Sequence, residues 1–235
     1  MRTIHIFKPL LFKITLLFIV TAFTLNTEPV KAQQMIVDDA EIVNYRSFQV
    51  ETWYGTEESW FQPAIALGRY WEFTPGIVFD SKDNFRADRW FTEIKFVPGD
   101  IDFDGYSYGF VFAPVFSVDG GFDEYYTYIP YSREILDRSS ILHVNLGFQA
   151  LKNGGDWDHA LTTGVRGDFE LNNRFTLLGE IFSADFGKPI LHGGFRIAIV
   201  PGLLESEITY GQGFRNSMDY PGFNVGIAFT PGTLW

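Results

Sequence analysis

Cysteine is absent from this sequence of 235 residues. Its absence excludes a small secreted domain stapled by disulfides, thiolate metal sites, cysteine nucleophiles and a lipid anchor attached through a cysteine. The fold must therefore be held together by burial of side chains and by backbone hydrogen bonds alone. The roughly 200 residues that follow the start of the chain fit one domain.

Basic residues are scarce, with 18 Lys and Arg against 29 Asp and Glu. The first 32 residues hold four of the basic side chains and one of the acidic ones, so residues 33–235 carry 14 basic and 28 acidic side chains and a formal charge of −14. Because the phosphates of nucleic acids are bound by basic surfaces, no nucleic-acid partner is expected. This charge is compatible with a membrane location.

Long apolar runs are missing beyond the start of the chain. Residues 14–25 are all apolar or threonine, but this run of about 12 residues is shorter than the roughly 20 that a transmembrane helix needs. It follows the basic residues Arg2, Lys8 and Lys13 and precedes Val30-Lys31-Ala32. This pattern predicts a signal peptide over residues 1–32, cleaved after Ala32. The alternative is an uncleaved membrane anchor.

Aromatic residues are abundant at 18% of the chain, whereas the mean hydropathy is close to zero. Large apolar residues alternate with small or polar ones, most clearly in residues 106–117, 141–150 and 190–200. This period of two is typical of β-strands with one apolar face. Strands are predicted near residues 46–54, 59–68, 70–80, 87–97, 103–117, 123–132, 139–151, 157–169, 173–184, 188–200, 203–213 and 221–231.

About 12 strands, an even number, predict an all-β fold over residues 45–235: a closed antiparallel up-and-down transmembrane β-barrel in the outer membrane of a Gram-negative-type bacterium. Short turn signals such as Pro201-Gly202 alternate with looser polar stretches such as 81–88, 151–157 and 213–220. Residues 132–140, a longer charged segment on the short-turn side, do not fit this alternation. A soluble periplasmic barrel is the alternative fold.

The tryptophans lie at or near the ends of the predicted strands, where aromatic girdles would contact outer-membrane lipid. These interfacial candidates are Trp53, Trp60, Trp71, Trp90, Trp157 and Trp235. The last predicted strand, 221–231, alternates strictly and is followed by the terminal Trp235. It resembles the C-terminal signal of outer-membrane proteins, which implies the barrel assembly machinery as a partner.

Residues 33–44 precede the first predicted strand, either as a periplasmic segment or as a plug in the lumen. Val37-Asp38-Asp39-Ala40, then Phe48 to Trp53 and the strand from Trp60 to Ala64, resemble the opening of exported barrels often filed as transporters in the meta-pathway of phenol degradation. The resemblance covers about 30 residues. It implies transport.

If the large apolar residues face lipid, polar residues of both charge signs line the lumen, either as a polar path for a small solute or as a salt-bridged interior. These lumen candidates are Glu51, Glu72, Glu93, Lys95, His143, Asn145, Arg166, Asp168, Glu180, His192, Arg196 and Glu207. No histidine pair has metal-ligand spacing and no phosphate-binding glycine loop occurs, so no metal, cofactor or catalytic residue is expected.

A narrow channel or passive transporter for a small solute is therefore the first functional hypothesis, and the residues do not identify the solute. A non-conducting structural or surface-binding barrel is the second. A lipid-modifying enzyme is the third, because His143 and Asn145 share one face, and outer-membrane phospholipases use a His–Ser–Asn set on adjacent strands. The match is incomplete, since Asn145 stands where that family places its Ser.

Overall fold

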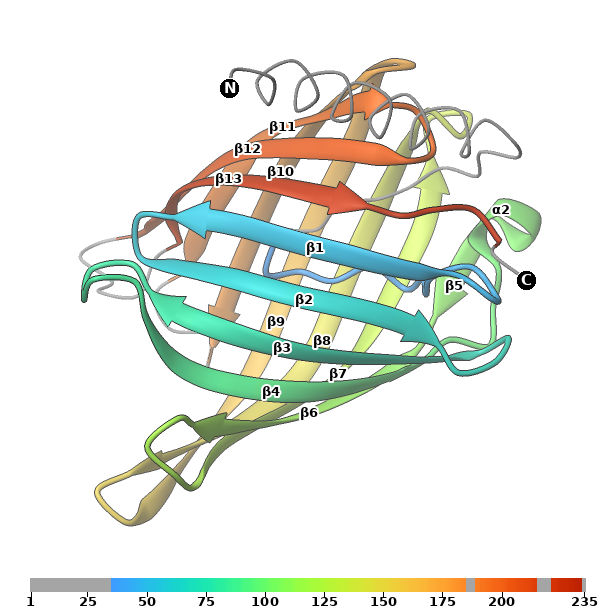
Figure 1. The fold of residues 1–235 in the computed structure, drawn as a ribbon. Helices are drawn as coiled ribbons and strands as arrows, with labels where there is room; N and C mark the ends of the chain where they lie inside the picture. The colour runs from blue at the N-terminus through green and yellow to red at the C-terminus, as the bar shows by residue number, and fades with distance from the viewer. Residues whose placement is uncertain (1–34, 185–188, 215–220, 234–235) are drawn as a thin grey trace, which may run out of the picture.

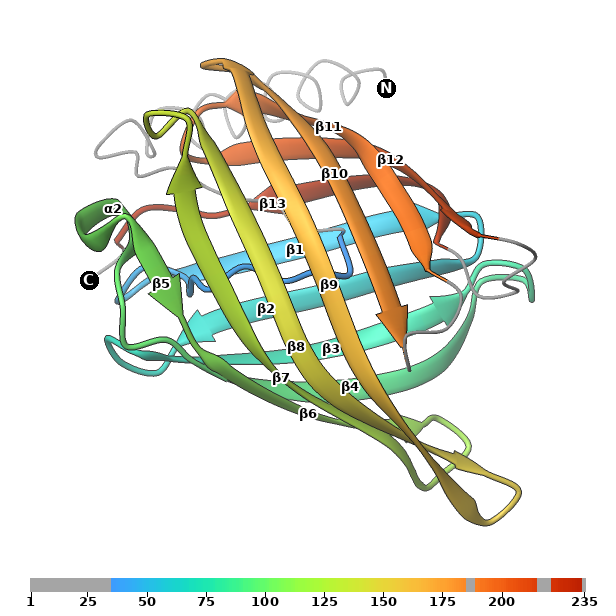
Figure 2. The ribbon, with the colours of Figure 1, turned by 180° about the vertical axis from the view of Figure 1, so that it is seen from behind.

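The computed structural model describes residues 35–184, 189–214 and 221–233. Within these residues twelve strands form one antiparallel sheet that closes on itself, and a thirteenth short strand, β5, precedes β6 along the same neighbour, β7 (Figures 1 and 2). The strands are β1 Phe48–Gly55, β2 Glu58–Ala66, β3 Trp71–Asp80, β4 Arg86–Phe96, β5 Tyr106–Tyr108, β6 Phe110–Ser117, β7 Phe122–Ile135, β8 Ser140–Asn153, β9 Asp156–Asn172, β10 Phe175–Ala184, β11 Ile190–Val200, β12 Leu204–Gly213 and β13 Gly222–Phe229. The predicted closed antiparallel barrel of about 12 strands is confirmed.

The first and last strands close the ring. In β1, Glu51 lies opposite Ala228 of β13, and Trp53 lies opposite Gly226. All neighbouring pairs are antiparallel and each strand follows its predecessor around the barrel, as an up-and-down topology requires. β5 and β6 both pair with β7, so together they form one strand of the ring interrupted at Gly109.

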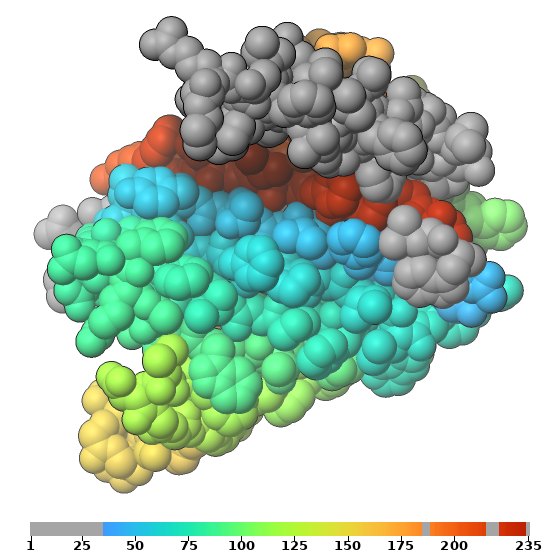
Figure 3. Space-filling model, viewed as in Figure 1, coloured from blue at the N-terminus to red at the C-terminus, as the bar shows by residue number. Residues whose placement is uncertain are grey.

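The outer surface is apolar and the inner surface is polar. On β8, for example, Leu146 is 58% exposed on the outside while His143 and Asn145 are buried inside. The same alternation gives exposed Phe195 beside buried Arg196 on β11. Figure 3 shows side chains of β1 to β4 covering the wall on that side. Period-two alternation thus sorts the side chains into an apolar belt and a polar lumen.

Two connections differ from the sequence predictions at the turn end, the rim that carries residues 67–70, 136–139, 173–174 and 201–203. Residues 132–140 are not a long segment, because β7 continues to Ile135 and a turn of residues in the left-handed region, Leu136 to Arg138, leads directly into β8. The short connection between the strands predicted near 87–97 and 103–117 instead holds a short helix, α2 (Ile101–Asp104), because the Asp100 side chain accepts hydrogen bonds from the backbone N–H of Asp102 and Phe103.

The opposite rim, the loop end, carries residues 56–57, 81–85, 118–121 and 154–155. The loop predicted over residues 151–157 is shorter, because β8 and β9 extend as one long hairpin that turns at Gly154 and Gly155. This hairpin and the β6–β7 hairpin project past the rim (Figure 2). In the described residues, no helix is both long and apolar enough to cross a membrane.

Candidate functional site

Residues 35–44, the inner segment, run through the interior of the barrel rather than along its surface (Figure 2). Glu180 on β10 accepts hydrogen bonds from the backbone N–H of Ile36 and Val37, at 2.9 and 2.8 Å. On the opposite wall, Glu72 on β3 accepts one from the N–H of Val43 at 2.7 Å. The inner segment therefore spans the lumen between two carboxylates, and the wall satisfies backbone donors near both of its ends.

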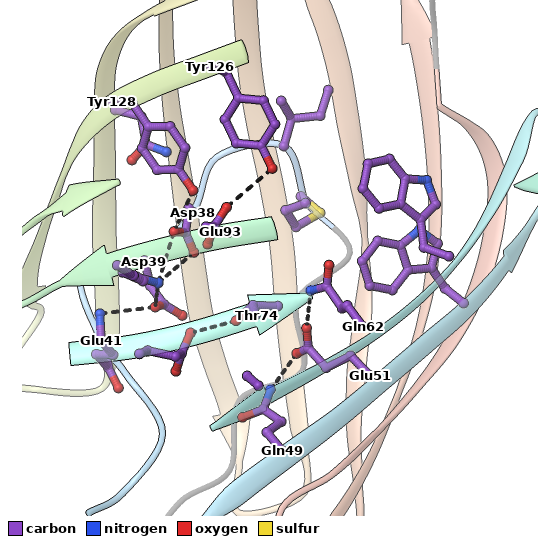
Figure 4. A pocket seen from close by; sticks show the side chains of 18 of the residues that line it. Asp38, Asp39, Glu41, Gln49, Glu51, Gln62, Thr74, Glu93, Tyr126 and Tyr128 are labelled. Carbon is purple, nitrogen blue, oxygen red and sulfur yellow. Dashed lines mark hydrogen bonds and ion pairs between the residues drawn. The ribbon is translucent and has the colours of Figure 1, made fainter. Parts of the chain in front are cut away.

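Lys95 on β4 holds the acidic part of the inner segment. Its Nζ lies 2.9 Å from a carboxylate oxygen of Asp38 and 3.3 Å from one of Asp39 (Figure 4). The Tyr128 hydroxyl also donates to Asp38, at 2.8 Å. All three charged side chains are about nine-tenths buried, with 6%, 11% and 8% exposure for Lys95, Asp38 and Asp39. A buried charge needs such pairing, so these contacts position the segment.

A second charged cluster, the arginine network, occupies the wall on the far side of the inner segment. Arg166 binds Asp168 at 2.8 Å, and Arg196 binds Asp168 at 3.2 Å and Glu207 at 2.6 Å. Glu205 lies 3.6 Å from Arg196. Arg166 also donates to the backbone oxygen of Val37 at 2.6 Å, which joins this network to the inner segment. The two arginines are thus neutralised by carboxylates of the wall.

A cavity of about 630 Å³ lies beside the inner segment. Glu57, Glu58 and Pro221 line it at the loop end, and Asp102 and Thr230 line it at the turn end. Its wall comes mainly from β1 to β4 and β7, including Glu51, Gln62, Thr74, Glu93, Tyr126 and Tyr128 (Figure 4). One continuous cavity therefore reaches from rim to rim of the barrel.

The predicted lumen residues all belong to this interior. Eleven of the twelve are buried: Glu51, Glu72, Lys95, His143, Asn145, Arg166, Asp168, Glu180, His192, Arg196 and Glu207. The twelfth, Glu93, lines the cavity and accepts a hydrogen bond from the Tyr126 hydroxyl at 3.2 Å. These residues occur in three places: in the wall of the cavity, in the contacts that hold the inner segment, and in the arginine network.

The prediction of an interfacial position is wrong for two of the tryptophans. Trp53 and Trp60 line the interior cavity, where their rings stack at 5.6 Å between centroids. Glu51, two residues before Trp53, points inward. Because residues two apart in a strand share a face, Trp53 also points inward, although it lies near a strand end. Trp71 and Trp90 are 46% and 42% exposed on the outside, and Trp157 packs against Phe122. Trp235 lies outside the described residues.

Sequence reasoning missed Asp38, Asp39, Tyr126 and Tyr128 as members of the site. The two tyrosines alternate with outward residues of β7, so the phase of that strand was the signal that points them inward. No local pattern marks Asp38 and Asp39, because their role depends on where the inner segment runs.

His143 and Asn145, the two residues suspected of lipid hydrolysis, lie in the lumen, away from the outer surface. Ser132, His143 and Asp168 form a chain, with 2.7 Å between the Ser132 hydroxyl and His143 Nδ1 and 3.7 Å between His143 Nε2 and Asp168. The Ser132 hydroxyl also accepts from the N–H of Ala40 at 2.7 Å, and none of the three lines the cavity. Within the described residues no cluster of three or more potential ligands is placed to hold a metal ion.

Three solved structures of porins share this architecture. KdgM porin in complex with disordered oligogalacturonate matches with a TM-score of 0.58 and 9% identity, over 78% of this chain and 98% of that one. KdgM porin alone matches with a TM-score of 0.54 and 11% identity, over 78% and 98%. NanC porin matches with a TM-score of 0.55 and 14% identity, over 77% and 98%. The chain is similar in fold to these porins.

This likeness concerns the barrel rather than the residues inside it, since so few positions are identical. No family model matches the sequence, and no curated protein does. The resemblance within residues 37–64 to the barrels filed as phenol-degradation transporters therefore stays a prediction.

Proposed function

We propose that this chain is an outer-membrane β-barrel that passes small solutes through a narrow channel. The observation that carries this proposal is the cavity of about 630 Å³, which is lined at one end by Glu57 and Glu58 and at the other by Asp102 and Thr230. A salt-bridged interior without a path would leave no such cavity. The fold likeness to KdgM and NanC porins supports the same function.

The outer membrane is the location that the surface favours. Large apolar side chains such as Leu146, Ile181 and Phe195 stand about half exposed on the outside of the barrel. Water would not stabilise such a belt, whereas lipid would. The predicted signal peptide over residues 1–32 and the alternating last strand, with the assembly machinery as its partner, are consistent with export to this membrane.

The inner segment makes the channel narrow. Eight strands leave room only for side chains and sixteen or more leave an aqueous channel, so a ring of twelve has an intermediate bore. Residues 35–44 then occupy part of that bore, held by Glu72, Lys95 and Glu180. We assign this segment as a plug that leaves a path along β1 to β4.

Planar-bilayer recording of the purified full chain tests the proposal. Folded protein, identified by its heat-modifiable migration, is expected to give discrete conductance steps, while heat-denatured protein gives none. Folded protein that stays silent would refute the channel and favour the non-conducting barrel. That second candidate is supported by the arginine network, in which paired charges fill part of the interior.

A solute related to phenol breakdown is the finer proposal, and it rests only on the resemblance within residues 37–64. Uptake of labelled phenolic carboxylates into liposomes that contain the protein, compared with liposomes lacking it, measures it directly. Equal rates would remove the resemblance as a guide to the solute.

A further inference from the structure

We propose that the loop-end part of the cavity binds uncharged, flat ring compounds that carry a hydrogen-bonding group at their edge. This inference rests on the proposed channel function and names the class of solute. It is carried by aromatic and aliphatic side chains that line the cavity, and not by the charged groups of the lumen. We call these residues the ring site: Met35, Ile36, Trp53, Trp60 and Phe182.

The ring site turns apolar side chains toward an otherwise polar lumen. Trp53 and Trp60 lie opposite each other on β1 and β2, next to the turn at residues 56–57. Phe182 lies near the end of β10 at the same rim. Ile36 lines the cavity and is 37% exposed, although the inner segment lies inside the barrel. Apolar surface left open within a concave cavity of about 630 Å³ is typical of a site for a small ligand.

The two tryptophans form a platform that is held in place from behind. Their ring planes differ by 14°, so both indoles have nearly the same orientation. Trp60 packs against Phe91, with 5.5 Å between the ring centroids. Phe91 is buried with Val78 and Val115, and its ring fills the space over Gly76, where a Cβ would stand 2.2 Å from it. A platform packed in this way has little freedom to lose when a ligand binds.

Apolar side chains of other elements complete the ring site. Met35 and Ile36 belong to the inner segment, and the N–H of Ile36 is fixed by its hydrogen bond to Glu180 at 2.9 Å. Phe182 belongs to β10, which β11, β12 and β13 separate from β1. A ligand on the platform therefore meets apolar groups from more than one side. This arrangement favours an aromatic ring, which is apolar on both faces, over a sugar, whose hydroxyls must lose water.

Neutral polar groups lie next to the ring site. Gln62 is two residues from Trp60 and lines the same cavity, and Tyr126 packs against the same cluster as Trp60 (Figure 4). Gln62 donates to Glu51 at 2.7 Å, and the Tyr126 hydroxyl donates to Glu93 at 3.2 Å. A side-chain amide has two N–H donors and an acceptor, and a hydroxyl accepts while it donates, so both groups can bond a ligand and keep these partners. Because neither group is charged, they suit a neutral substituent.

Block of the ion current in planar bilayers tests the inference. Nicotinamide is the probe, because it is flat, uncharged and carries an amide at the edge of its ring. At millimolar concentration it is expected to interrupt the current through the wild-type full chain. Glucose at the same concentration should interrupt the current far less, because its ring lacks two apolar faces.

Variants of the ring site should weaken this block. Trp53→Leu is expected to raise the half-blocking concentration about five-fold, since an aromatic pair adds the corresponding free energy beyond its buried area. Ile36→Ala, which changes no residue of the strands, should raise that concentration as well. Trp71→Leu is the matched control and should behave like the wild type, because Trp71 is 46% exposed on the outside of the barrel.

The outcomes separate the ring site from the channel. Conductance that glucose blocks as well as nicotinamide does, or that neither blocks, overturns the ring site while the channel stands. The same half-blocking concentration for Trp53→Leu and Trp71→Leu also overturns it. Folded wild-type protein without conductance overturns the channel. Equilibrium dialysis of labelled nicotinamide against folded protein in detergent then decides the ring site alone, and equal binding by the two tryptophan variants would refute it.

Discussion

Single residues decide how the lumen is divided. Lys95 is the clearest case, because one buried ammonium reaches two carboxylates of a segment more than fifty positions away in the chain. Glu180 and Glu72 play the matching role for backbone donors. At this scale the interior is a set of anchors for residues 35–44, and removing an anchor should loosen that segment before it affects the barrel.

Lys95→Gln is expected to release the inner segment. Asp38 and Asp39 would lose the ammonium of Lys95 while still buried, and breaking a buried ion pair by removing one partner costs about 3–5 kcal/mol. Amides of residues 36–40 should exchange faster with solvent, which mass spectrometry of hydrogen exchange measures. Arg138→Gln, which removes an exposed pair with Glu134, is the control and should change nothing. Equal exchange in the two variants would contradict the anchor.

Gly164 is the residue that makes room for the inner segment. A Cβ atom at this position would stand 2.4 Å from a methyl carbon of Val37. Gly164→Ala should therefore displace residues 36–38, and the same hydrogen-exchange measurement reports it. Gly179→Ala on the neighbouring strand β10 is a matched control, since nothing lies within 4 Å of its added Cβ. Displacement in both variants would show a general effect of alanine instead.

Whole elements have separate roles in this molecule. The strands form the wall through pairing with their neighbours, and the inner segment contributes no strand to that sheet. It contacts the wall through side chains and through its own backbone donors. The barrel should therefore close without it.

Deletion of residues 33–44 is expected to widen the channel without unfolding the barrel. Single-channel conductance should rise, because the segment occupies part of the bore, while heat-modifiable migration is retained. A variant in which residues 33–44 are replaced by a Gly and Ser sequence of the same length is the control for chain length. Unchanged conductance in the deletion variant would show that the inner segment does not narrow the path.

At the scale of the whole molecule, an apolar belt encloses a polar interior, the reverse of a soluble protein. Exposed Leu146, Ile181 and Phe195 on the outside contrast with fully buried Arg166 and His143 inside. This inversion distinguishes a membrane barrel from the soluble periplasmic barrel that the sequence left open.

Membrane fractionation checks that distinction. The protein is expected in the outer-membrane fraction, resistant to high-salt and carbonate washes and released only by detergent, because the belt contacts lipid through apolar burial rather than through charge. A periplasmic protein carrying the same signal peptide is the control. Recovery in the soluble fraction would contradict the membrane location.

The sequence by itself determined the wall. Period two decides which side chains share a face, so Glu51, His143, Arg166 and Arg196 were predicted inside from local pattern alone, and strand bounds agreed within a few residues. The same rule predicts that the Trp53 side chain points into the lumen, as it does. Its place near a strand end led instead to its assignment to an interfacial aromatic girdle.

Only the tertiary structure decided which inward residues meet. Glu180 meets Val37 across 143 positions, and Arg196 meets Asp168 because β9, β10 and β11 lie side by side in one register. These pairings depend on how the ring closes and on the course of residues 35–44, and no local sequence pattern predicts either. Alternation along a strand determines that a side chain points inward. The closed barrel determines whether that side chain holds the inner segment, pairs with an arginine or lines the cavity.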